Sequence, residues 1–350
     1  MDLLGLRSYA HDRHNSLGWS SDCLLETRID KRAAYQRLLM PPKPTSKRAT
    51  AQAADTLSDV LTVDVEDYYH VEAFADRISA HTWPDYPSRV GENTRRILRI
   101  FEEHACRGTF FVLGWVAERD PALIREIVAA GHEVACHSYA HRRVNSLTPE
   151  EFRQDLRRAR IAIEDAAGLR VSGYRAPTFS IGRDNLWALE ILAEEGFLYD
   201  SSIFPVRHDV YGFPGAPRFP HHLKLQSKRE LFEIPMSTVR IGGMDWPAGG
   251  GGYLRLIPMP YTRWAVQQIH EKERQPVILY LHPWELDPKQ PRIAGRWKSR
   301  LRHYVGLTGM EKRLRELLAS GTYITALELV QRLSPNVTSP GKGVPVLAAD

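Results

Sequence analysis

The stretch that decides the fold is a short apolar segment followed at once by two histidines, Glu133-Val134-Ala135-Cys136-His137-Ser138-Tyr139-Ala140-His141. The first four residues are expected to form a strand. If one helical turn follows, His137 and His141 project from the same side, because residues four apart are neighbours on a helix. Neutral imidazole is the commonest metal ligand in proteins. The pair therefore predicts half of the coordination sphere of a divalent ion.

An acidic cluster closes an earlier strand and could supply the rest of that sphere. The apolar run 60–65 is followed by Glu66 and Asp67, and it contains Asp64 near its end. Carboxylate oxygens join imidazole nitrogens in many divalent metal sites. The two segments together predict a metal centre built from separate strand ends.

Composition limits the classes of protein that this chain can belong to. It has 350 residues, 43% hydrophobic content, a formal charge of +5 and a pI near 9.0, which allow one large α/β barrel. The basic residues are spread along the chain without interleaved aromatics, so nucleic-acid binding is not favoured. Three cysteines, Cys23, Cys106 and Cys136, form no CxxC pair, which argues against a disulfide scaffold.

The ends of the chain differ in composition from the middle. Residues 1–56 lack sustained periodicity and end in a Pro- and Lys-rich linker, so they are expected to be a disordered extension. Residues 334–350 are expected to be a flexible tail. No apolar run reaches the length of a membrane span, and no signal-peptide core is apparent near the start. The expected location is therefore cytoplasmic, with peripheral attachment to a membrane polysaccharide-synthesis machine as an option.

Apolar strands alternate with amphipathic helices over the middle of the chain. The expected strands are 60–65, 108–113, 133–136, 171–176, 197–200, 230–235 and 276–281. The expected helices open at a Ser88 cap, run from Pro121 to Gly131, from a Thr148 capping box to about Ala167 and from Asn185 to Glu195, and begin near Tyr261. This alternation predicts a mostly parallel sheet covered by helices.

Reactive side chains stand where these strands end. They are Asp64 and its neighbours, His137, Arg175, Asp200 and His282. The chemistry of α/β barrels sits at the carboxyl ends of the strands, so the five positions are expected to meet at one site.

Two imidazoles plus a carboxylate, with an open position, are typical of a catalytic rather than a structural metal site. Hydrolysis of an amide or ester also needs a base for water and an acid for the leaving group. We expect Asp64 to be the base, oriented by Arg175, and His282 to be the acid, paired with Asp200. Each residue alone has an ordinary structural explanation, such as an ion pair or a solvated histidine.

The set of motifs resembles the polysaccharide deacetylase (NodB-homology) family of metal-dependent enzymes. The matching segments are Thr62-Val63-Asp64-Val65-Glu66-Asp67, His137-Ser138-Tyr139-Ala140-His141, Arg175-Ala176-Pro177-Thr178-Phe179, Asp200-Ser201-Ser202 and Leu279-Tyr280-Leu281-His282. The resemblance implies a distorted (β/α)7-type barrel over residues 57–285 and one divalent metal, zinc first, with Co²⁺, Ni²⁺ or Mn²⁺ as alternatives. It also implies the roles given above, with the backbone N–H of Thr178 as an oxyanion donor.

One departure from the family pattern concerns the carboxylate ligand. The commonest form has two adjacent aspartates, whereas here Asp64 is followed by Val65, Glu66 and Asp67. The spacing resembles a branch that includes peptidoglycan deacetylases and allantoinase-like amidohydrolases. We therefore expect Glu66 to be the ligand, with Asp67 second, since Asp64 and Glu66 share one face of a strand.

A narrower resemblance covers the C-terminal part of the chain. The segments 250–258, 282–288 and 300–304 are similar to the deacetylase subfamily of exosortase (PEP-CTERM) exopolysaccharide loci. It implies an additional region, residues 286–333, packed on the barrel. The glycine run 249–252 lacks the Lys-Ser/Thr of a phosphate loop and predicts a tight loop close to a sugar. The aromatic residues Trp246, Tyr253 and Trp284 are candidates for sugar stacking.

The sequence therefore predicts a metal-dependent deacetylase of an N-acetylated oligo- or polysaccharide, or of a lipid-linked sugar precursor. The alternatives are an amidohydrolase of the same fold, acting on another linear or cyclic C–N bond, and a non-catalytic sugar-binding protein. A structural partner of a membrane-bound synthase is a weaker alternative.

Overall fold

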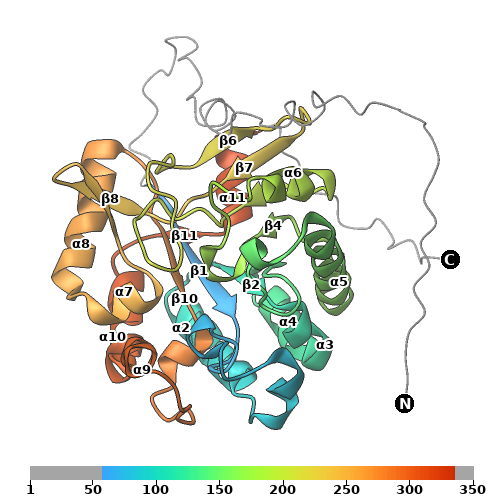
Figure 1. Ribbon diagram of the computed structural model, residues 1–350. Helices are drawn as coiled ribbons and strands as arrows, with labels where there is room; N and C mark the ends of the chain where they lie inside the picture. The colour runs from blue at the N-terminus through green and yellow to red at the C-terminus, as the bar shows by residue number, and fades with distance from the viewer. Residues whose placement is uncertain (1–56, 336–350) are drawn as a thin grey trace, which may run out of the picture.

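The computed structural model describes residues 57–335; the predicted disordered extension and most of the predicted tail lie outside this range. Figure 1 shows a central sheet, with the strand β1 (Asp59–Val65) in its middle and helices around it. The other strands of this sheet are β2 (Thr109–Val112), β3 (Glu133–Cys136), β4 (Gly173–Tyr174), β5 (Tyr199–Asp200), β6 (His221–Lys224), β7 (Glu230–Glu233), β10 (Ile278–Leu281) and β11 (Tyr323–Ile324).

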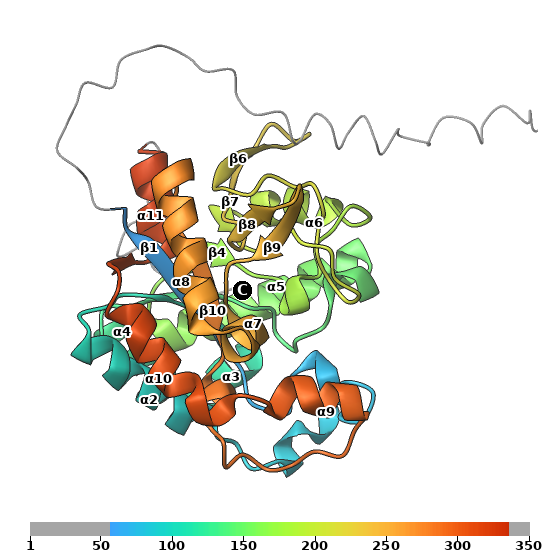
Figure 2. The same cartoon turned by 90° about the vertical axis from the view of Figure 1, so that its left-hand side faces the viewer.

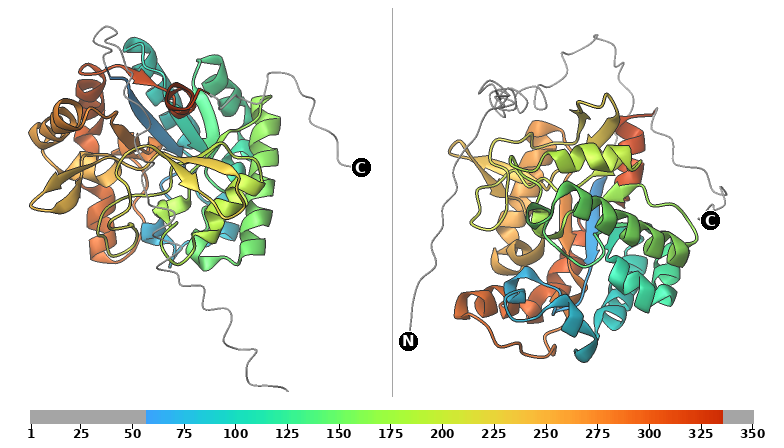
Figure 3. Two further views of the ribbon diagram at one scale, coloured as in Figure 1. Left: turned by 90° about the horizontal axis from the view of Figure 1, so that it is seen from above. Right: turned by 45° about the vertical axis from the view of Figure 1, so that its right-hand side comes forward.

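The sheet follows the order β10-β1-β2-β3-β4-β5-β7-β6, and β11 pairs with the start of β1. All neighbours from β10 to β7 are parallel, whereas β6 pairs with β7 in the antiparallel sense. Viewed from above, the sheet curls round on itself (Figure 3). Ser237 bridges the remaining gap, because its hydroxyl accepts from Ile278 N at 2.8 Å and its own N–H donates to Ile278 O at 3.2 Å. The expected distorted seven-stranded barrel is therefore confirmed.

Helices surround the curled sheet, most of them on its outer face. They are α2 (Val90–Glu103), α3 (Gly114–Arg119), α4 (Pro121–Ala129), α5 (Pro149–Ala167), α6 (Trp187–Glu194), α7 (Gly251–Leu256), α8 (Met259–Gln268), α9 (Trp297–Tyr304), α10 (Leu307–Leu318) and α11 (Ala326–Leu333). Figure 1 and Figure 2 both show α11 above α10, with α8 on the outer side of the molecule. A small separate hairpin is formed by β8 (Thr238–Ile241) and β9 (Met244–Pro247). Within residues 57–335, no helix is both long enough and apolar enough to cross a bilayer.

The helix α5 begins and ends as its sequence predicts. The Thr148 hydroxyl accepts from Glu151 N, the Glu151 carboxylate accepts from Thr148 N, and Pro149 occupies the first helical position. Gly168 ends the helix with φ +68°, which glycine adopts without a steric penalty. The helix α2 begins differently from the prediction: Ser88 does not cap it, because Asp67 accepts from the N–H groups of Arg89 and Val90.

Candidate active site at the carboxyl ends of the strands

The predicted site residues converge where the parallel strands end. Asp64 and Glu66 close β1, His137 follows β3, Arg175 follows β4 and His282 follows β10. A cavity of about 210 Å³ opens at this edge. It is lined by Asp64, Glu66, His137, His141, Thr178, Trp284 and His282, together with residues of later segments. The barrel topology thus brings together positions that are more than 200 residues apart in the sequence.

Glu66, His137 and His141 form a set of donors suited to a metal ion. One ligand atom from each lies within 4.8 Å of the others. The carbonyl oxygen of Arg175 lies 2.9 Å from His137 Nδ1, and because a carbonyl can only accept, this bond places the proton on Nδ1 and leaves Nε2 free as a ligand. Burial lowers the pKa of His137 to about 4, which keeps the ring neutral.

The Glu66 carboxylate is ionised and incompletely satisfied. Burial works against its charge, but the neighbouring His141, His282 and His137 outweigh that effect and hold the pKa below its usual range. Among the described residues, the only polar group close to Glu66 Oε2 is His141 Nε2, at 2.8 Å. A buried carboxylate oxygen directed at two imidazoles fits a divalent cation between them.

The loop that carries the two histidines is not the expected helical turn. Ser138 has φ +70° and His141 has φ +52°, so the chain bends sharply twice between the imidazoles. Neighbouring helices hold this shape: Gly114 N and Trp115 N of α3 donate to the carbonyls of Ser138 and Tyr139. The ring centroids of His137 and His141 are 5.4 Å apart. The two rings are thus brought together by the loop, without helical periodicity.

Asp67, predicted as the second carboxylate ligand, lies outside the donor set. Its Oδ2 accepts from Ser88 Oγ at 2.9 Å, Arg89 N at 2.7 Å and Val90 N at 3.0 Å. These partners turn the carboxylate toward the start of α2 and away from His137. The alternation of side chains along β1 gives the physical reason, since neighbouring positions face opposite ways.

Asp64 is held by a fully buried arginine. Arg175 Nη1 donates to Asp64 Oδ1 at 2.6 Å and to Thr62 Oγ1 at 2.6 Å. The rest of the guanidinium is fixed by Ser201, whose carbonyl and hydroxyl oxygens accept from Nε and Nη2. A carboxylate in this setting is oriented toward the cavity and can accept a proton there.

His282 pairs with Glu285, where we had predicted Asp200. Glu285 Oε2 lies 3.2 Å from His282 Nδ1 and accepts from His282 N at 2.9 Å. Burial alone would lower the pKa of His282, but Glu285, Glu66 and Asp64 raise it to about 9. Its Nε2 faces the cavity, 3.4 Å from Glu66 Oε1 and 3.9 Å from Asp64 Oδ2. The imidazolium is therefore a proton donor at neutral pH.

Asp200 has a different set of partners. Its carboxylate accepts from Ser202 Oγ at 2.6 Å and from Ser202 N at 3.2 Å, and Ser202 Oγ in turn accepts from Ala176 N at 2.8 Å. Burial raises the pKa of Asp200 to about 6. The expected pairing of Asp200 with His282 is wrong: β5 places Asp200 behind the segment that follows Arg175, and it supports that segment instead.

Arg255 contacts Glu285, the partner of His282, from the C-terminal region of the chain. Its Nε donates to Glu285 Oε1 at 2.6 Å, and both side chains are buried. Burial opposes the charge on Glu285, but Arg255 and His282 outweigh it and lower the pKa to about 2. Neither residue was predicted from the sequence. A signal for Glu285 existed, because the run His282-Pro283-Trp284-Glu285 has the Pro and the Glu spacing of a capping box.

Thr178 lines the cavity in a strained turn. Thr178 has φ +57° and Phe179 has φ +49°, a left-handed conformation that residues with side chains seldom adopt. The role of the Thr178 N–H as an oxyanion donor stays a prediction.

The three predicted stacking aromatics lie in different surroundings. Trp246 is 47% exposed on β9 and does not line the cavity. Tyr253 is half-buried, and its hydroxyl accepts from Tyr211 at 3.2 Å. Trp284 lines the cavity but is buried between the rings of His282 and His303. Tyr211, which was not predicted from the sequence, lines the cavity as well.

The glycine run 249–252 allows the backbone to pack closely against the Tyr280 ring. Gly250 and Gly251 have positive φ, and a Cβ on either would lie 2.6–2.7 Å from the Tyr280 ring. Gly252 alone lines the cavity. The tight loop is thus as predicted, but its close approach is to Tyr280.

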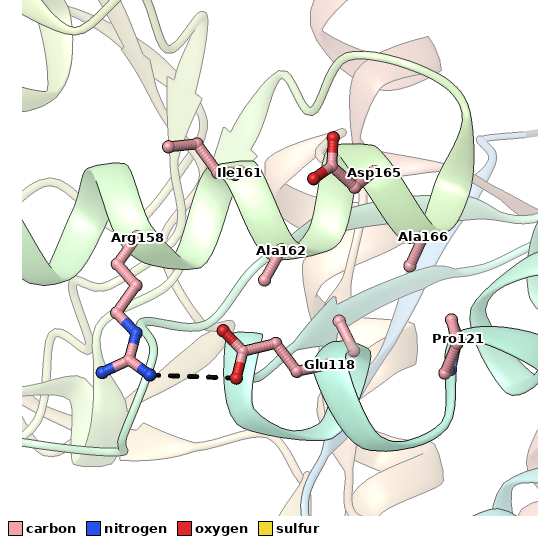
Figure 4. Close-up of a pocket in the computed structure, with 8 residues that line it drawn as sticks. Glu118, Pro121, Arg158, Ile161, Ala162, Asp165 and Ala166 are labelled. Atoms are coloured by element: carbon pink, nitrogen blue, oxygen red, sulfur yellow. Dashed lines mark ion pairs between the residues drawn. The ribbon is translucent and has the colours of Figure 1, made fainter. Parts of the chain in front are cut away.

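A second hollow lies on the outer surface, between α3 and α5 (Figure 4). It measures about 500 Å³ and is lined mainly by apolar side chains, with an ion pair of 3.8 Å between Arg158 and Glu118. It offers no imidazole or thiol, so the strand-end cavity is the better candidate for chemistry.

Comparison with known families agrees with the geometry of this cavity. A family model described as "Polysaccharide deacetylase" matches residues 73–194. Residues 73–194 belong to the polysaccharide deacetylase family. A second model, described as "Domain of unknown function (DUF3473)", matches residues 201–331. The deacetylase match contains the loop with His137 and His141, while the second match contains His282, Glu285 and Arg255.

Two solved structures share the fold of this chain. One is a Mycobacterium smegmatis protein assigned to the polysaccharide deacetylases, with 25% identity, a TM-score of 0.51 and coverage of 88% of this chain and all of that one. The other is Puue allantoinase, which at 15% identity and a TM-score of 0.55 shows the fold alone, over 85% of this chain and all of that one.

Curated relatives of the deacetylase region are similar over shorter stretches. A peptidoglycan deacetylase-like protein of Gibberella zeae is 33% identical over 135 residues, which are 37% of this chain and 38% of that protein. A chitooligosaccharide deacetylase of Bradyrhizobium is 31% identical over 100 residues, 29% of this chain and 43% of that protein. The chain thus covers less than half of the length of each of these relatives.

Proposed function

We propose that this chain is a metal-dependent hydrolase that removes acetyl groups from the amino groups of N-acetylated sugars. One observation carries the proposal: a single cavity holds the Glu66, His137 and His141 donor set, a carboxylate fixed by Arg175, and a protonated His282. Amide hydrolysis needs these three elements within reach of one bond. The family assignment of residues 73–194 and the names of its relatives support the same activity.

The residues present fit a divalent metal ion. Two neutral imidazoles and one carboxylate, with positions left open, are the donor set of catalytic zinc sites, and imidazole also suits Co²⁺ and Ni²⁺. We therefore propose that Glu66, His137 and His141 hold the ion, Zn²⁺ in the first place. When bound there, the ion would polarise the acetyl carbonyl and acidify the attacking water.

Asp64 is proposed to take the proton from that water. Its Oδ1 is fixed by Arg175, so Oδ2 remains directed at the cavity. The water oxygen attacks the carbonyl carbon of the acetamide, and the negative charge that develops on the carbonyl oxygen needs a donor. We propose the N–H of Thr178 for this role, because Thr178 lines the same cavity.

His282 is proposed to complete the reaction by protonating the leaving nitrogen. Its Nδ1 is engaged by Glu285, so the proton on Nε2 is the one available to the cavity. The C–N bond then breaks, which yields acetate and the free amine of the sugar. The charge of Glu285 keeps the ring protonated until this step.

The sugar is proposed to be N-acetylglucosamine or a close analogue, within an exopolysaccharide or its lipid-linked precursor. A relative named peptidoglycan-N-acetylglucosamine deacetylase, from Bacillus cereus, supports this sugar at 30% identity over 112 residues, 32% of this chain and 40% of that protein. The choice of exopolysaccharide rests on the resemblance of the C-terminal segments described above. An amidohydrolase activity and a non-catalytic role in sugar binding remain the alternatives that the experiment below separates.

The test measures metal content and acetate release together. We expect about one equivalent of divalent metal and release of acetate from N-acetylglucosamine oligomers in the wild type, and loss of both in His137→Ala. His222→Ala, at an exposed position on the sheet-edge strand β6, is the matched control and should behave as the wild type. Metal without acetate release would favour the amidohydrolase alternative. Absence of metal after reconstitution would contradict the mechanism and favour a binding role.

A further inference from the structure

The helix α9 presents an apolar ridge to solvent, composed of Trp297, Leu301 and Val305. Trp297 and Leu301 are 70% and 54% exposed and lie four apart on α9, so they share one face of the helix. Val305, 37% exposed, follows directly after the helix in extended conformation and continues the ridge at its end. The opposite side of α9 is anchored, because His303 is buried and its ring lies 5.0 Å from that of Phe74. The ridge therefore points away from the core; the ring contact of Trp297 is with the neighbouring Lys298, whose Nζ lies 5.7 Å from the ring centroid.

Cations flank the ridge on both sides. Between residues 288 and 310 the sequence has six Lys or Arg residues and no Asp or Glu. At 100° per residue, Arg300 falls on one side of the ridge, and Lys298 and Arg302 fall on the other. Arg302 and Arg296 lie near carboxylates of other segments, Asp209 at 3.4 Å and Asp76 at 3.9 Å.

Lys298 and Arg300 keep their charge uncompensated. Within residues 57–335, no carboxylate lies within 4.0 Å of either side chain. An apolar stripe with Trp, bordered by unpaired cations, is the pattern of a helix that lies in the interface of a bilayer. The cations are attracted to anionic headgroups, and the indole is favoured at the boundary between headgroups and acyl chains.

We propose that α9 docks this protein on the surface of an anionic lipid bilayer, with the ridge of Trp297, Leu301 and Val305 inserted at the headgroup level. Charge complementarity favours an anionic bilayer over a second copy of the chain, because two copies would bring the same cations against one another. The helix spans only about 12 Å, so docking is peripheral and reversible.

The position of α9 gives the docking a consequence for the substrate. Arg302 and His303 of the same helix line the catalytic cavity, beside His282 and Trp284. Figures 1 and 2 both show α9 at the lower margin of the molecule. A docked α9 would hold the mouth of the cavity next to the headgroups, where a sugar carried on a membrane lipid is presented. This consequence, unlike the docking itself, rests on the proposed deacetylase function.

The docking is tested by sedimentation of the full chain with lipid vesicles. We expect binding to vesicles of phosphatidylcholine with phosphatidylglycerol, weak binding to phosphatidylcholine alone, and loss of binding at high salt. The double variant W297A/L301A should lower the partition constant at least about ten-fold, and Lys298→Gln or Arg300→Gln about five-fold each. Ile161→Ala, 61% exposed on α5, and Arg170→Gln are the matched controls on another side of the molecule and should bind as the wild type.

Several results would overturn the proposal. They are absence of binding to anionic vesicles, binding that W297A/L301A leaves unchanged, and an equal loss in Ile161→Ala. A dimer in sedimentation velocity that W297A/L301A dissociates, without vesicle binding, would replace the bilayer by a second copy. Acetate release from soluble oligomers should be unchanged in W297A/L301A. If the wild type releases no acetate, the proposed function fails while the vesicle measurement still decides the docking.

Discussion

Glu66 and Asp67 are neighbours in the sequence but have different surroundings. Glu66 faces the two imidazoles, whereas Asp67 accepts the N–H groups that open α2. The reason is the alternation of side chains at the end of β1, which directs only one of two adjacent carboxylates at the cavity. We therefore expect Glu66 to serve metal binding and Asp67 to serve folding stability.

Alanine at the two positions is expected to affect two different properties. Glu66→Ala should lower metal affinity by more than about a hundred-fold. Asp67→Ala should leave the metal content unchanged and lower the free energy of unfolding by about 1–3 kcal/mol, because buried N–H groups lose their acceptor. Metal analysis and urea unfolding of both variants check this, and loss of metal from Asp67→Ala would show that Asp67 is a ligand after all.

Glu285 controls the charge of His282 through the bond at Nδ1. It does not belong to the metal donor set, so its effect persists when a cation offsets the charge of Glu66. The pKa of His282 is raised to about 9, so the acid form exists below that pH and is lost as the pH rises through it.

Glu285→Gln should therefore move the basic limb of the kcat profile to lower pH by about one unit or more. Glu285→Asp keeps the charge and is the control, expected to move the limb far less. The kcat of Glu285→Gln could instead fall at every pH, with the basic limb at the pH of the wild type. That result would mean that Glu285 supports the fold and that other groups set the pKa of His282.

At this scale the sequence predicts the identity of most cavity residues but not all of their partners. Asp64, Glu66, His137, His141, Arg175 and His282 meet as expected because strand order determines where strand ends lie. The partner of His282 was missed since it depends on the reach of two side chains, Glu285 and Arg255, from segments that carry no strong periodic signal.

Among the elements, those with strong periodicity or caps were predictable. The strands near 60–65, 109–112, 133–136 and 278–281 and the helix α5 agree with expectation. The loop after β3 was not, because its shape comes from positive φ at Ser138 and His141 and from contacts with α3. The hairpin β8–β9 was also missed. Its strands flank the turn at Gly242 and Gly243 and show apolar alternation, but each has only four residues, a length at which alternation is a weak signal. The separation of residues 286–333 from the deacetylase domain at 57–285 stays a prediction.

The turn before α7 provides a test at the scale of one element. Gly250 has φ +97°, and a Cβ there would lie 2.6 Å from the Tyr280 ring. Gly250→Ala should lower the free energy of unfolding by about 2 kcal/mol or more, because it adds steric overlap to backbone strain. Gly196→Ala is the control, because Gly196 has φ +83° and a Cβ there would meet nothing within 4 Å. It measures backbone strain alone and should lower the free energy of unfolding by a smaller amount. Equal losses in urea unfolding would mean that the contact with Tyr280 relaxes freely.

In the whole molecule, the proposed metal ion joins the end of β1 to the loop after β3. An ion that binds only the folded chain stabilises it by about 2.7 kcal/mol at a hundred times its Kd. For a domain of this size that corresponds to a rise in Tm of about 5–10 °C. Differential scanning fluorimetry with and without EDTA should show this shift in the wild type. A similar shift in His137→Ala would place the stabilising ion elsewhere.

The barrel is joined across a long span of the chain, and this affects how the protein is made. Thr62 Oγ1 of β1 donates to Leu279 O of β10, 217 positions further on. At 5–20 residues per second, a ribosome needs about 10–40 s to add that stretch. Throughout this interval one edge of β1 lacks its partner strand β10. The proposed base Asp64 lies near the end of that strand. We therefore expect the nascent chain to depend on chaperones until residue 281 has emerged. The last proposed metal donor, His141, is synthesised about 7–28 s before the proposed proton donor, His282.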